Sequence, residues 1–264
     1  MAPFMQPNLN IPVLSFTTMA IQTEFVTLGV SDGSSMRAYV AHPEGHPKAG
    51  LMVFQEIFGI NAHIRDITER FAREGYLAVA PELFHRTGEG FESGYTDMAP
   101  GREHAQKTTD AGLAADIHSA FNWIHTHTPG LKVAAAGYCM GGRVAALAAM
   151  TVPLACGIAY YGGGIAPHPF YKVNLIERMG DIGCPMLFCW GGKDHFIPPD
   201  AVHAVTSAMR AANKPFASVE FSDADHGFFC DARASYHAAA AAQSWPLTLA
   251  YLANYASAAK TTGA

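Results

Sequence analysis

Short, continuous apolar runs constrain the fold of this chain more than any other feature. The runs are AGLMVFQE (49–56), YLAVAPE (76–82), LKVAAAGYC (131–139), LACGIAYYGG (154–163) and PMLFCWGG (185–192). A half-buried strand alternates polar and apolar residues, whereas a strand buried on both faces does not. Such runs are typical of parallel sheets that helices cover on each side. They therefore predict the central strands of a sheet of this kind.

Helical segments separate these runs. In NAHIRDITERFAREG (61–75), Ile64, Ile67 and Phe71 form one apolar face at helical spacing. Further helices are expected over 104–127, 140–150, 200–213 and 235–256. Residues 85–103 are rich in Gly, Glu and Thr and predict a loop.

The N-terminal part of the chain predicts a different arrangement. The segments TEFVTLGV and MRAYVAHP flank the turn-forming SDGSS and predict a hairpin at one edge of the sheet. This hairpin and the strand–helix alternation that follows it predict an α/β fold. The expected architecture is a three-layer sandwich of the α/β-hydrolase type, with a mostly parallel sheet and an antiparallel N-terminal hairpin. Residues 19–264 are expected to form a single domain, and residues 1–18, with three prolines, a loose extension. Pro246 is expected to kink or split the last helix.

Composition and charge narrow the possible partners and the compartment. The chain has 264 residues, of which 50% are hydrophobic and 15% charged, enough for a sizeable core. The net charge of −5 and the lack of a basic face argue against nucleic acid. No apolar run is long enough to predict a membrane span, and the N-terminus lacks a signal-peptide pattern. Five cysteines are an odd number for a disulfide framework, so we expect a cytoplasmic protein, and nothing in the sequence argues against a monomer.

A metal site is not expected from cysteine spacing. Cys184 and Cys189 flank an apolar run that predicts a buried strand. Zinc-binding cysteine pairs lie closer together, on a turn.

The run that ends at Cys139 passes into a glycine-rich turn, GYCMGG. Gly137, Cys139 and Gly141 match the nucleophile-elbow pattern G-x-S-x-G with sulfur in place of oxygen. A nucleophile on a sharp strand-to-helix turn needs neighbours without side chains. The N–H of Met140 would then point at a developing oxyanion. The alternative is a tight turn around a buried, inert cysteine.

A triad of this topology needs an acid and a histidine later in the chain. Asp194 follows the predicted strand in LFCWGGKDHFIPPD, and His226 follows the last predicted strand in VEFSDADHGFF. An aspartate in such a loop is often only a helix cap, and one of 13 histidines near a strand end is unremarkable. The three residues in this order, each after a strand, predict that His226 handles the proton of Cys139 and that Asp194 orients the imidazole.

These motifs together resemble the dienelactone hydrolase (carboxymethylenebutenolidase) family, a branch of the α/β hydrolases with a cysteine nucleophile. The resemblance spans residues 22–256 and rests on QEIFG, APELFHR, GYCMGG, GGKDHFIP and DADHGFF, in that order. It implies that Cys139, Asp194 and His226 are the catalytic triad and that the enzyme needs no cofactor.

The resemblance also gives a role to Glu56. From spacing alone, a solvated carboxylate or a helix cap explains this residue as well as a functional role does. In the family, this additional carboxylate lies beside the thiol until substrate turns it away, and it takes part in forming the thiolate. The resemblance further implies that the N–H of Ile57 is the second oxyanion donor.

The family holds a substrate carboxylate with two arginines, and the sequence matches this feature in part. APELFHR supplies Arg86, for which an ordinary ion pair is the alternative. The second arginine is expected where Cys230 stands, and Arg233 follows three positions later. Tyr138 and Phe228 are candidates for lining the substrate pocket. We therefore expect a small-molecule lactone or ester as substrate, with an anionic group whose second anchor is missing or moved.

The sequence thus predicts a carboxylic ester hydrolase that cleaves lactones or activated esters through an acyl-enzyme. A broader carboxylesterase or thioesterase on the same site is one alternative. A non-catalytic binding protein that uses Cys139 as a redox sensor is another, although a sensor needs no orienting aspartate.

Overall fold

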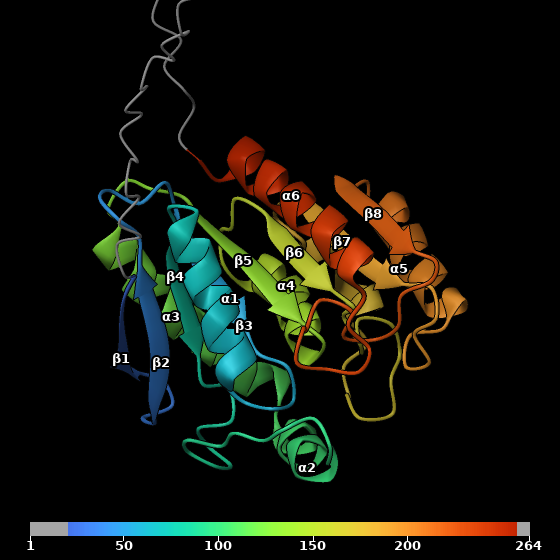
Figure 1. The fold of residues 1–264 in the computed structure, drawn as a ribbon, viewed down its shortest axis with the longest axis horizontal. Helices are drawn as coiled ribbons and strands as arrows, with labels where there is room; N and C mark the ends of the chain where they lie inside the picture. Colours follow the sequence, from blue (N-terminus) through green and yellow to red (C-terminus); the bar gives the residue numbers. More distant parts are fainter. Residues whose placement is uncertain (1–20, 258–264) are drawn as a thin grey trace, which may run out of the picture.

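One sheet of eight strands runs through the part of the chain that the computed structural model describes, residues 21–257 (Figure 1). The strands are β1 (Gln22–Gly29), β2 (Ser35–His42), β3 (Gly50–Phe54), β4 (Leu77–Pro81), β5 (Val133–Tyr138), β6 (Gly157–Tyr160), β7 (Met186–Gly191) and β8 (Phe216–Phe221). Their order in the sheet is β1-β2-β4-β3-β5-β6-β7-β8. The hairpin β1–β2 and the pair β2–β4 are antiparallel, and all neighbours from β4 to β8 are parallel. The predicted fold class is confirmed, whereas the extension expected over residues 1–18 lies outside the described residues.

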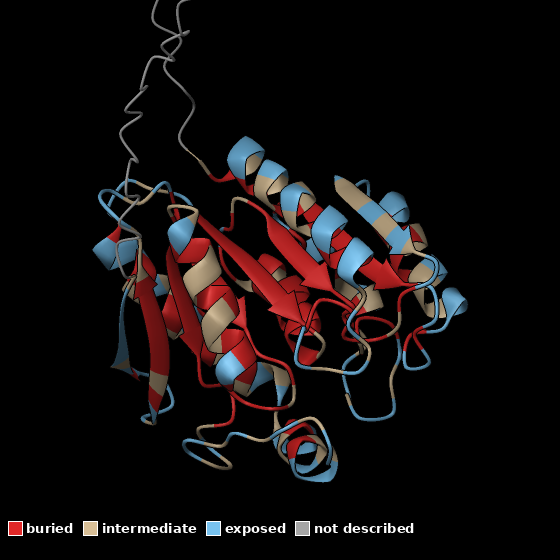
Figure 2. Ribbon diagram, viewed as in Figure 1, coloured by how far each residue is buried: buried red, intermediate tan, exposed pale blue. Residues whose placement is uncertain are grey.

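The apolar runs form the centre of this sheet, as their composition predicts. Every residue of β3, β4, β5, β6 and β7 is buried. The edge strands β1 and β8 are mostly exposed or half-buried instead (Figure 2). Central strands without exposed positions fix the carboxyl ends of β3, β5, β6 and β7 rigidly, and functional side chains follow those ends.

Helices cover both faces of the sheet. They are α1 (Ala62–Arg73), α2 (Ala99–Lys107), α3 (Asp110–His127), α4 (Met140–Thr151), the 3₁₀ helix η1 (Leu175–Asp181), α5 (Pro199–Ala211) and α6 (Ala238–Tyr255). In Figure 1, α1 and α6 lie in front of the sheet, where Phe71 and Trp245 pack with ring centroids 4.7 Å apart. Helices α3 and α4 pack together behind it. Within residues 21–257, no helix has the length and apolarity that a membrane span requires.

The segment before the nucleophile strand differs from the prediction. The expected loop over 85–103 ends in a helix, α2, and the single helix expected over 104–127 is divided between α2 and α3. The division falls at Thr109, whose side chain accepts a hydrogen bond from the N–H of Gly112 (3.1 Å) and so caps α3. Figure 1 shows α2 set apart from the sandwich, beyond the carboxyl ends of the parallel strands.

Helix α6 continues through Pro246, so of the two expected effects of the proline, a split of the helix does not occur. A proline inside a helix leaves the carbonyl four residues earlier without its N–H partner. Both Pro246 and Ala242 are exposed, so water can satisfy that carbonyl on the solvent face of the helix.

Candidate active site

Cys139 occupies the sharp turn between β5 and α4 that the glycine pattern predicts. Its backbone has φ 54° and ψ −117°, a region that non-glycine residues rarely adopt. A Cβ atom at Gly137 would overlap the carbonyl of Gly141, and one at Gly141 would overlap the carbonyl of Phe54. The two glycines therefore let the turn pack backbone to backbone, and the strained turn presents the thiol at the strand end.

His226 and Asp194 meet beyond the ends of β8 and β7. Nδ1 of His226 and Oδ2 of Asp194 are 2.7 Å apart, and both side chains are buried. The other oxygen of Asp194 accepts hydrogen bonds from the backbone N–H groups of Phe196 (2.8 Å) and Ile197 (3.1 Å). The carboxylate is thus held on both sides, which fixes the orientation of the imidazole.

The surroundings of His226 favour its charged form. Burial by itself would lower the pKa of His226, but the neighbouring Cys139 sulfur and the Asp194 carboxylate outweigh burial and raise the pKa to about 10. Tyr161 and Phe196 pack edge-on against the imidazole, with ring centroids 5.1 and 5.2 Å away. An imidazolium in this position stabilises a thiolate once the proton of the adjacent cysteine has been removed.

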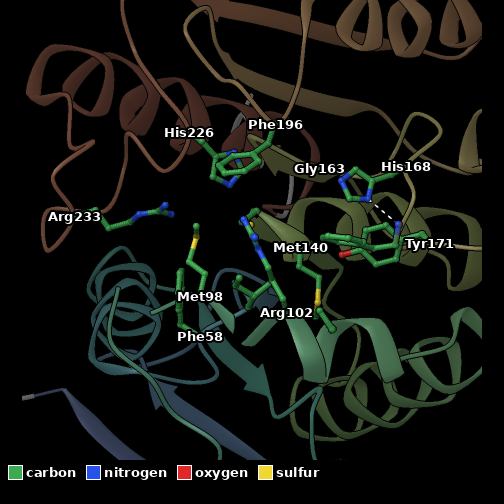
Figure 3. A pocket seen from close by; sticks show the side chains of 14 residues that line it. Phe58, Met98, Arg102, Met140, Gly163, His168, Tyr171, Phe196, His226 and Arg233 are labelled. Carbon is green, nitrogen blue, oxygen red and sulfur yellow. Dashed lines mark hydrogen bonds between the residues drawn. The ribbon is translucent and has the colours of Figure 1, made fainter. Parts of the chain in front are cut away.

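A pocket opens above these groups (Figure 3). It is lined by Ile57, Phe58, Met98, Arg102, Ala105, Cys139, Met140, Gly163, His168, Phe170, Tyr171, Phe196, His226 and Arg233. Its wall is largely apolar, and Phe170 and Phe196 are 39% and 46% exposed, which is high for aromatic side chains. Concave, mostly apolar sites with a few convergent polar groups are typical of small-molecule binding.

Ile57 and Met140, the expected oxyanion donors, both line this pocket beside Cys139. Met140 is the first residue of α4, and Ile57 lies in the loop after β3. Among residues 21–257, neither backbone N–H donates to another backbone or side-chain group. Both donors are therefore free to bind an oxygen of a ligand.

Glu56 is fully buried at the end of β3 and faces Arg233. Its Oε1 accepts a hydrogen bond from Nη1 of Arg233 (3.1 Å). Burial raises the pKa of Glu56, although Arg233 and His226 oppose this shift. The described residues include no hydrogen bond between Glu56 and Cys139, and the role that the family resemblance gives this carboxylate stays a prediction.

The structure places Arg86 outside the pocket, which corrects its predicted role in substrate binding. Its guanidinium donates two hydrogen bonds to Asp116 (2.9 Å each) and one to Asp32 (2.7 Å). Asp116 is completely buried on α3 and also bonds His85. Arg86 therefore neutralises a buried carboxylate and holds the hairpin against α3.

Tyr138 and Phe228 are also absent from the pocket wall, contrary to the prediction. Both side chains are completely buried in the core. Tyr138 stacks on Tyr160 with ring centroids 4.9 Å apart, and Phe228 packs edge-on against Tyr161 at 5.2 Å. Side chains alternate along a strand, so the residue before the nucleophile points away from the reaction site.

Arg233 enters the pocket although it lies three positions after the expected site at Cys230. Successive hydrogen bonds join Cys230 to Gly227, Arg233 to Cys230 and Tyr236 to Arg233, each from N–H to the carbonyl three residues earlier. Every third residue of such a turn series lies on the same side. The displacement by three positions therefore keeps Arg233 near the site.

Arg102 is a pocket residue that the sequence analysis missed. It extends from α2 and lies 5.8 Å from the ring centre of Phe196. No acidic side chain among residues 21–257 forms an ion pair with it, whereas Arg233 is paired with Glu56. The sequence predicted a loop at this position, and a loop gives no basis for predicting where a side chain points. Arg102 could be assigned to the pocket only once helix α2 was known.

The sheet order, the strained turn after β5 and the histidine after the last strand define an α/β hydrolase. Residues 36–256 match the dienelactone hydrolase family, and the chain belongs to this family. A carboxymethylenebutenolidase of Pseudomonas putida is 30% identical over 238 residues, which cover 88% of this chain and 96% of the relative. A Yersinia pestis protein assigned to the same activity is 35% identical over 224 residues, 81% of this chain and 82% of the relative.

A solved structure agrees with this placement. A Klebsiella pneumoniae protein assigned as a dienelactone hydrolase is 36% identical and superimposes with a TM-score of 0.80, covering 89% of this chain and all (100%) of that one. The protein is therefore a hydrolase that acts on small-molecule esters or lactones.

Proposed function

We propose that this enzyme hydrolyses lactones and activated esters through a thioester on Cys139, with His226 and Asp194 completing the triad. One observation carries the proposal: a cysteine on a strained strand-to-helix turn opens into the same pocket as a histidine bound to a buried aspartate. The order Cys, Asp, His along the chain is that of the α/β hydrolases.

In the first half-reaction, the Cys139 thiolate attacks the carbonyl carbon of the substrate. The N–H groups of Ile57 and Met140 bind the resulting oxyanion. The bond to the leaving oxygen then breaks, and that oxygen takes the proton of the His226 imidazolium. In a lactone, the leaving oxygen stays attached to the acyl group as the ring opens.

In the second half-reaction, His226 accepts a proton from water, which attacks the thioester carbon. The carbon–sulfur bond breaks, and the acid product leaves with Cys139 as the thiolate again. A thiolate is a good leaving group from this intermediate. An enolate or aryloxide leaves readily in the first step as well, so activated esters and enol lactones suit a cysteine nucleophile.

Glu56 and Arg233 connect substrate binding to the thiol. A carboxylate-bearing substrate that binds Arg233 competes with Glu56 for the guanidinium. Burial already favours the protonated form of Glu56, so a carboxylate released from Arg233 is a ready proton acceptor. We assign it the role of taking the Cys139 proton when substrate is present, which protects the resting thiol from oxidation.

The two arginines in the pocket favour an anionic substrate, and we assign Arg102 the role of binding its anionic group. We expect Arg102→Gln to raise KM for p-nitrophenyl hemiglutarate about 10- to 100-fold, since a hydrogen bond to a charged group contributes roughly 1.5–3 kcal/mol. KM for p-nitrophenyl valerate, of similar length and uncharged, should change less than about twofold. Steady-state kinetics with both esters checks this.

Arg86→Gln is the matched control for Arg102→Gln. It should leave KM for both esters unchanged and lower the free energy of unfolding by about 2 kcal/mol, because Asp116 stays buried with His85 as its remaining partner. A KM effect of Arg86→Gln that exceeds that of Arg102→Gln would restore Arg86 as the substrate anchor.

The proposed reaction is tested with cis- and trans-dienelactone, p-nitrophenyl acetate and an aryl thioester. We expect turnover of at least one of these substrates. With p-nitrophenyl acetate, the aryl alcohol should appear in a burst equal to the enzyme concentration. After acid quenching, the peptide that contains Cys139 should be heavier by one acyl group. Preference for aryl acetate over dienelactone would favour the broader esterase, which the apolar wall and the exposed Phe170 and Phe196 also suit. Absence of turnover with the whole panel would favour the redox-sensing alternative.

We also propose that the enzyme works as a monomer in the cytoplasm. One copy of the chain supplies the triad and both oxyanion donors, so the proposed reaction requires no second subunit. Each of the five cysteines is a free thiol, which suits a reducing compartment.

A further inference from the structure

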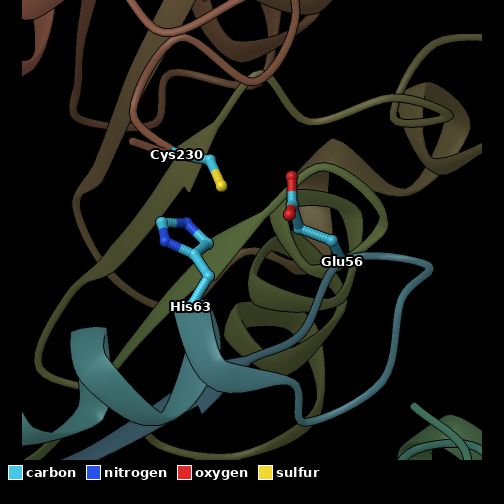
Figure 4. A group of neighbouring side chains, drawn as sticks. All are labelled: Glu56, His63 and Cys230. Atoms are coloured by element: carbon cyan, nitrogen blue, oxygen red, sulfur yellow. The ribbon is translucent and has the colours of Figure 1, made fainter. Parts of the chain in front are cut away.

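Three side chains that commonly bind metal ions converge at one buried point (Figure 4). Glu56 lies in the loop just after β3, His63 in the first turn of α1 and Cys230 in the loop between β8 and α6. One ligand atom of each lies within 4.8 Å of the others. Glu56 and Cys230 have no exposed surface, and His63 is only 5% exposed. The group is therefore enclosed, with His63 nearest to solvent.

Several of these atoms lack a partner. Within residues 21–257, neither ring nitrogen of His63 has a hydrogen-bond partner, nor does Oε2 of Glu56. Oε1 of Glu56 is bonded to Arg233, and one carboxylate oxygen of Glu56 lies within 4.8 Å of ligand atoms of His63 and Cys230. Buried polar atoms are nearly always satisfied in folded proteins. The cluster thus has unused capacity for a ligand at its centre.

The chemistry of the donors selects the kind of ligand. Carboxylate oxygen, imidazole nitrogen and thiolate sulfur all bind Zn²⁺, whereas Mg²⁺ and Ca²⁺ prefer oxygen ligands throughout. The Glu56 carboxylate and the Cys230 thiolate offset the two positive charges of the ion, which lowers the cost of burying it, and the Arg233 guanidinium bonded to Glu56 adds one further positive charge. Three protein ligands leave one position of a tetrahedron for solvent.

We infer that Glu56, His63 and Cys230 form a binding site for Zn²⁺ or an ion of similar preference, such as Co²⁺. Binding releases the thiol proton of Cys230 to solvent and forms one metal bond to each side chain. The ion also takes the carboxylate that the proposed mechanism uses, so its occupancy inhibits hydrolysis. This inhibition rests on the proposed function, whereas the binding site does not.

Cobalt binding to the full-length chain tests the site directly. The reduced Cys139→Ala protein is treated with chelator, desalted and titrated with Co²⁺, because this change removes a half-buried thiol next to His226 that could itself bind the metal. We expect one equivalent of Co²⁺ to bind, with a thiolate-to-cobalt charge-transfer band, and Zn²⁺ but not Mg²⁺ to displace it. X-ray absorption of the zinc-loaded protein should show a single sulfur ligand.

Matched variants assign the ligands. Each further substitution is made in the Cys139→Ala protein. Cys230→Ser should abolish the charge-transfer band, whereas Cys184→Ser, at another buried free cysteine, should leave the band unchanged. Adding His63→Leu should weaken cobalt binding by about 100-fold or more. Circular dichroism of each variant shows whether it is folded.

The activity of the wild-type enzyme tests the consequence. Zn²⁺ should inhibit ester hydrolysis, and EDTA should reverse the inhibition. His63→Leu should raise the inhibitory zinc concentration by the same factor by which it weakens cobalt binding. Each variant is compared with its own metal-free activity. If no substrate is turned over, the cobalt titration still decides whether the site exists.

Two results would overturn the inference. One is the absence of a cobalt band in Cys139→Ala, which would mean that the cluster holds only solvent. The other is a band that survives Cys230→Ser in the folded protein, or an X-ray absorption spectrum without a sulfur ligand, which would place the metal elsewhere.

Discussion

Replacing Cys139 with alanine is expected to lower kcat/KM for every substrate of this enzyme by about 10⁴-fold or more. The loss is large because the reaction loses its nucleophile, and water in the vacated space is weaker and is not held at the carbonyl carbon. Cys139→Ser should remain far below the wild type, since the neighbouring groups are arranged around a thiolate. Cys184→Ser is the control and should keep full activity. Equal activity of Cys139→Ala and the wild type would remove Cys139 from the mechanism.

The same variant should change the titration of its neighbour. Cys139 is the strongest of the groups that raise the pKa of His226 to about 10, so Cys139→Ala should lower this pKa. Because the folded-state pKa lies above the ordinary value of 6.5, His226 stabilises the wild-type fold fully below about pH 6.5 and progressively less as the pH rises toward 10. In Cys139→Ala this loss should occur at lower pH. Nuclear magnetic resonance titration of the imidazole protons measures the shift, and an unchanged pKa would show that the two side chains do not interact.

The second large effect concerns the turn that carries the nucleophile. Gly141→Ala is expected to lower the free energy of unfolding by about 3 kcal/mol or more. The new Cβ would overlap the carbonyl oxygen of Phe54 and lie 2.7 Å from that of Gln55, and both are backbone atoms at the end of the central strand β3. Backbone of a buried strand cannot move aside as a flexible side chain can.

Urea denaturation measures this loss, and Gly29→Ala is the matched control. A Cβ at Gly29 meets no atom within 4 Å, so that variant should stay within about 0.5 kcal/mol of the wild type. Similar unfolding midpoints for the two variants would show that the elbow tolerates a side chain, and that its glycine serves another purpose.

The fold was largely predictable from sequence because burial leaves a clear mark on strands. The runs that became β3 to β7 are apolar throughout, as a strand covered on both faces must be. Helix α2 was missed for the opposite reason. It buries only Gly101 and Ala105, and Pro100 and Gly101 at its start read as loop residues. A helix held by so little apolar surface has no periodicity to detect.

The residues of the candidate site also fall into those that the sequence predicts and those that it does not. Cys139, Asp194 and His226 each follow a predicted strand, so topology alone brings them to one edge of the sheet. Arg86 was misplaced because its partner, Asp116, is buried by tertiary packing that no local pattern reveals. Arg233 depends on the geometry of a long loop.

The cluster of Glu56, His63 and Cys230 shows the limit of spacing arguments about metals. Its third member lies far along the chain from the first two. A prediction of no metal site from cysteine spacing addresses only ligands that share a local turn.

The separation of α2 from the sandwich has a consequence for how such enzymes diversify. Cys139 and Asp194 follow the buried central strands β5 and β7, and His226 follows the edge strand β8, whereas one side of the pocket is a helix of 9 residues between two connecting segments. Gly101 rests against the carbonyl of Ile57, so this helix touches the catalytic framework at a point where no side chain intervenes. Mutation can therefore exchange the residues of this helix, and with them the preferred substrate, while the reaction chemistry is inherited unchanged. An ancestral enzyme with this layout would give rise to new specificities by altering a single peripheral module.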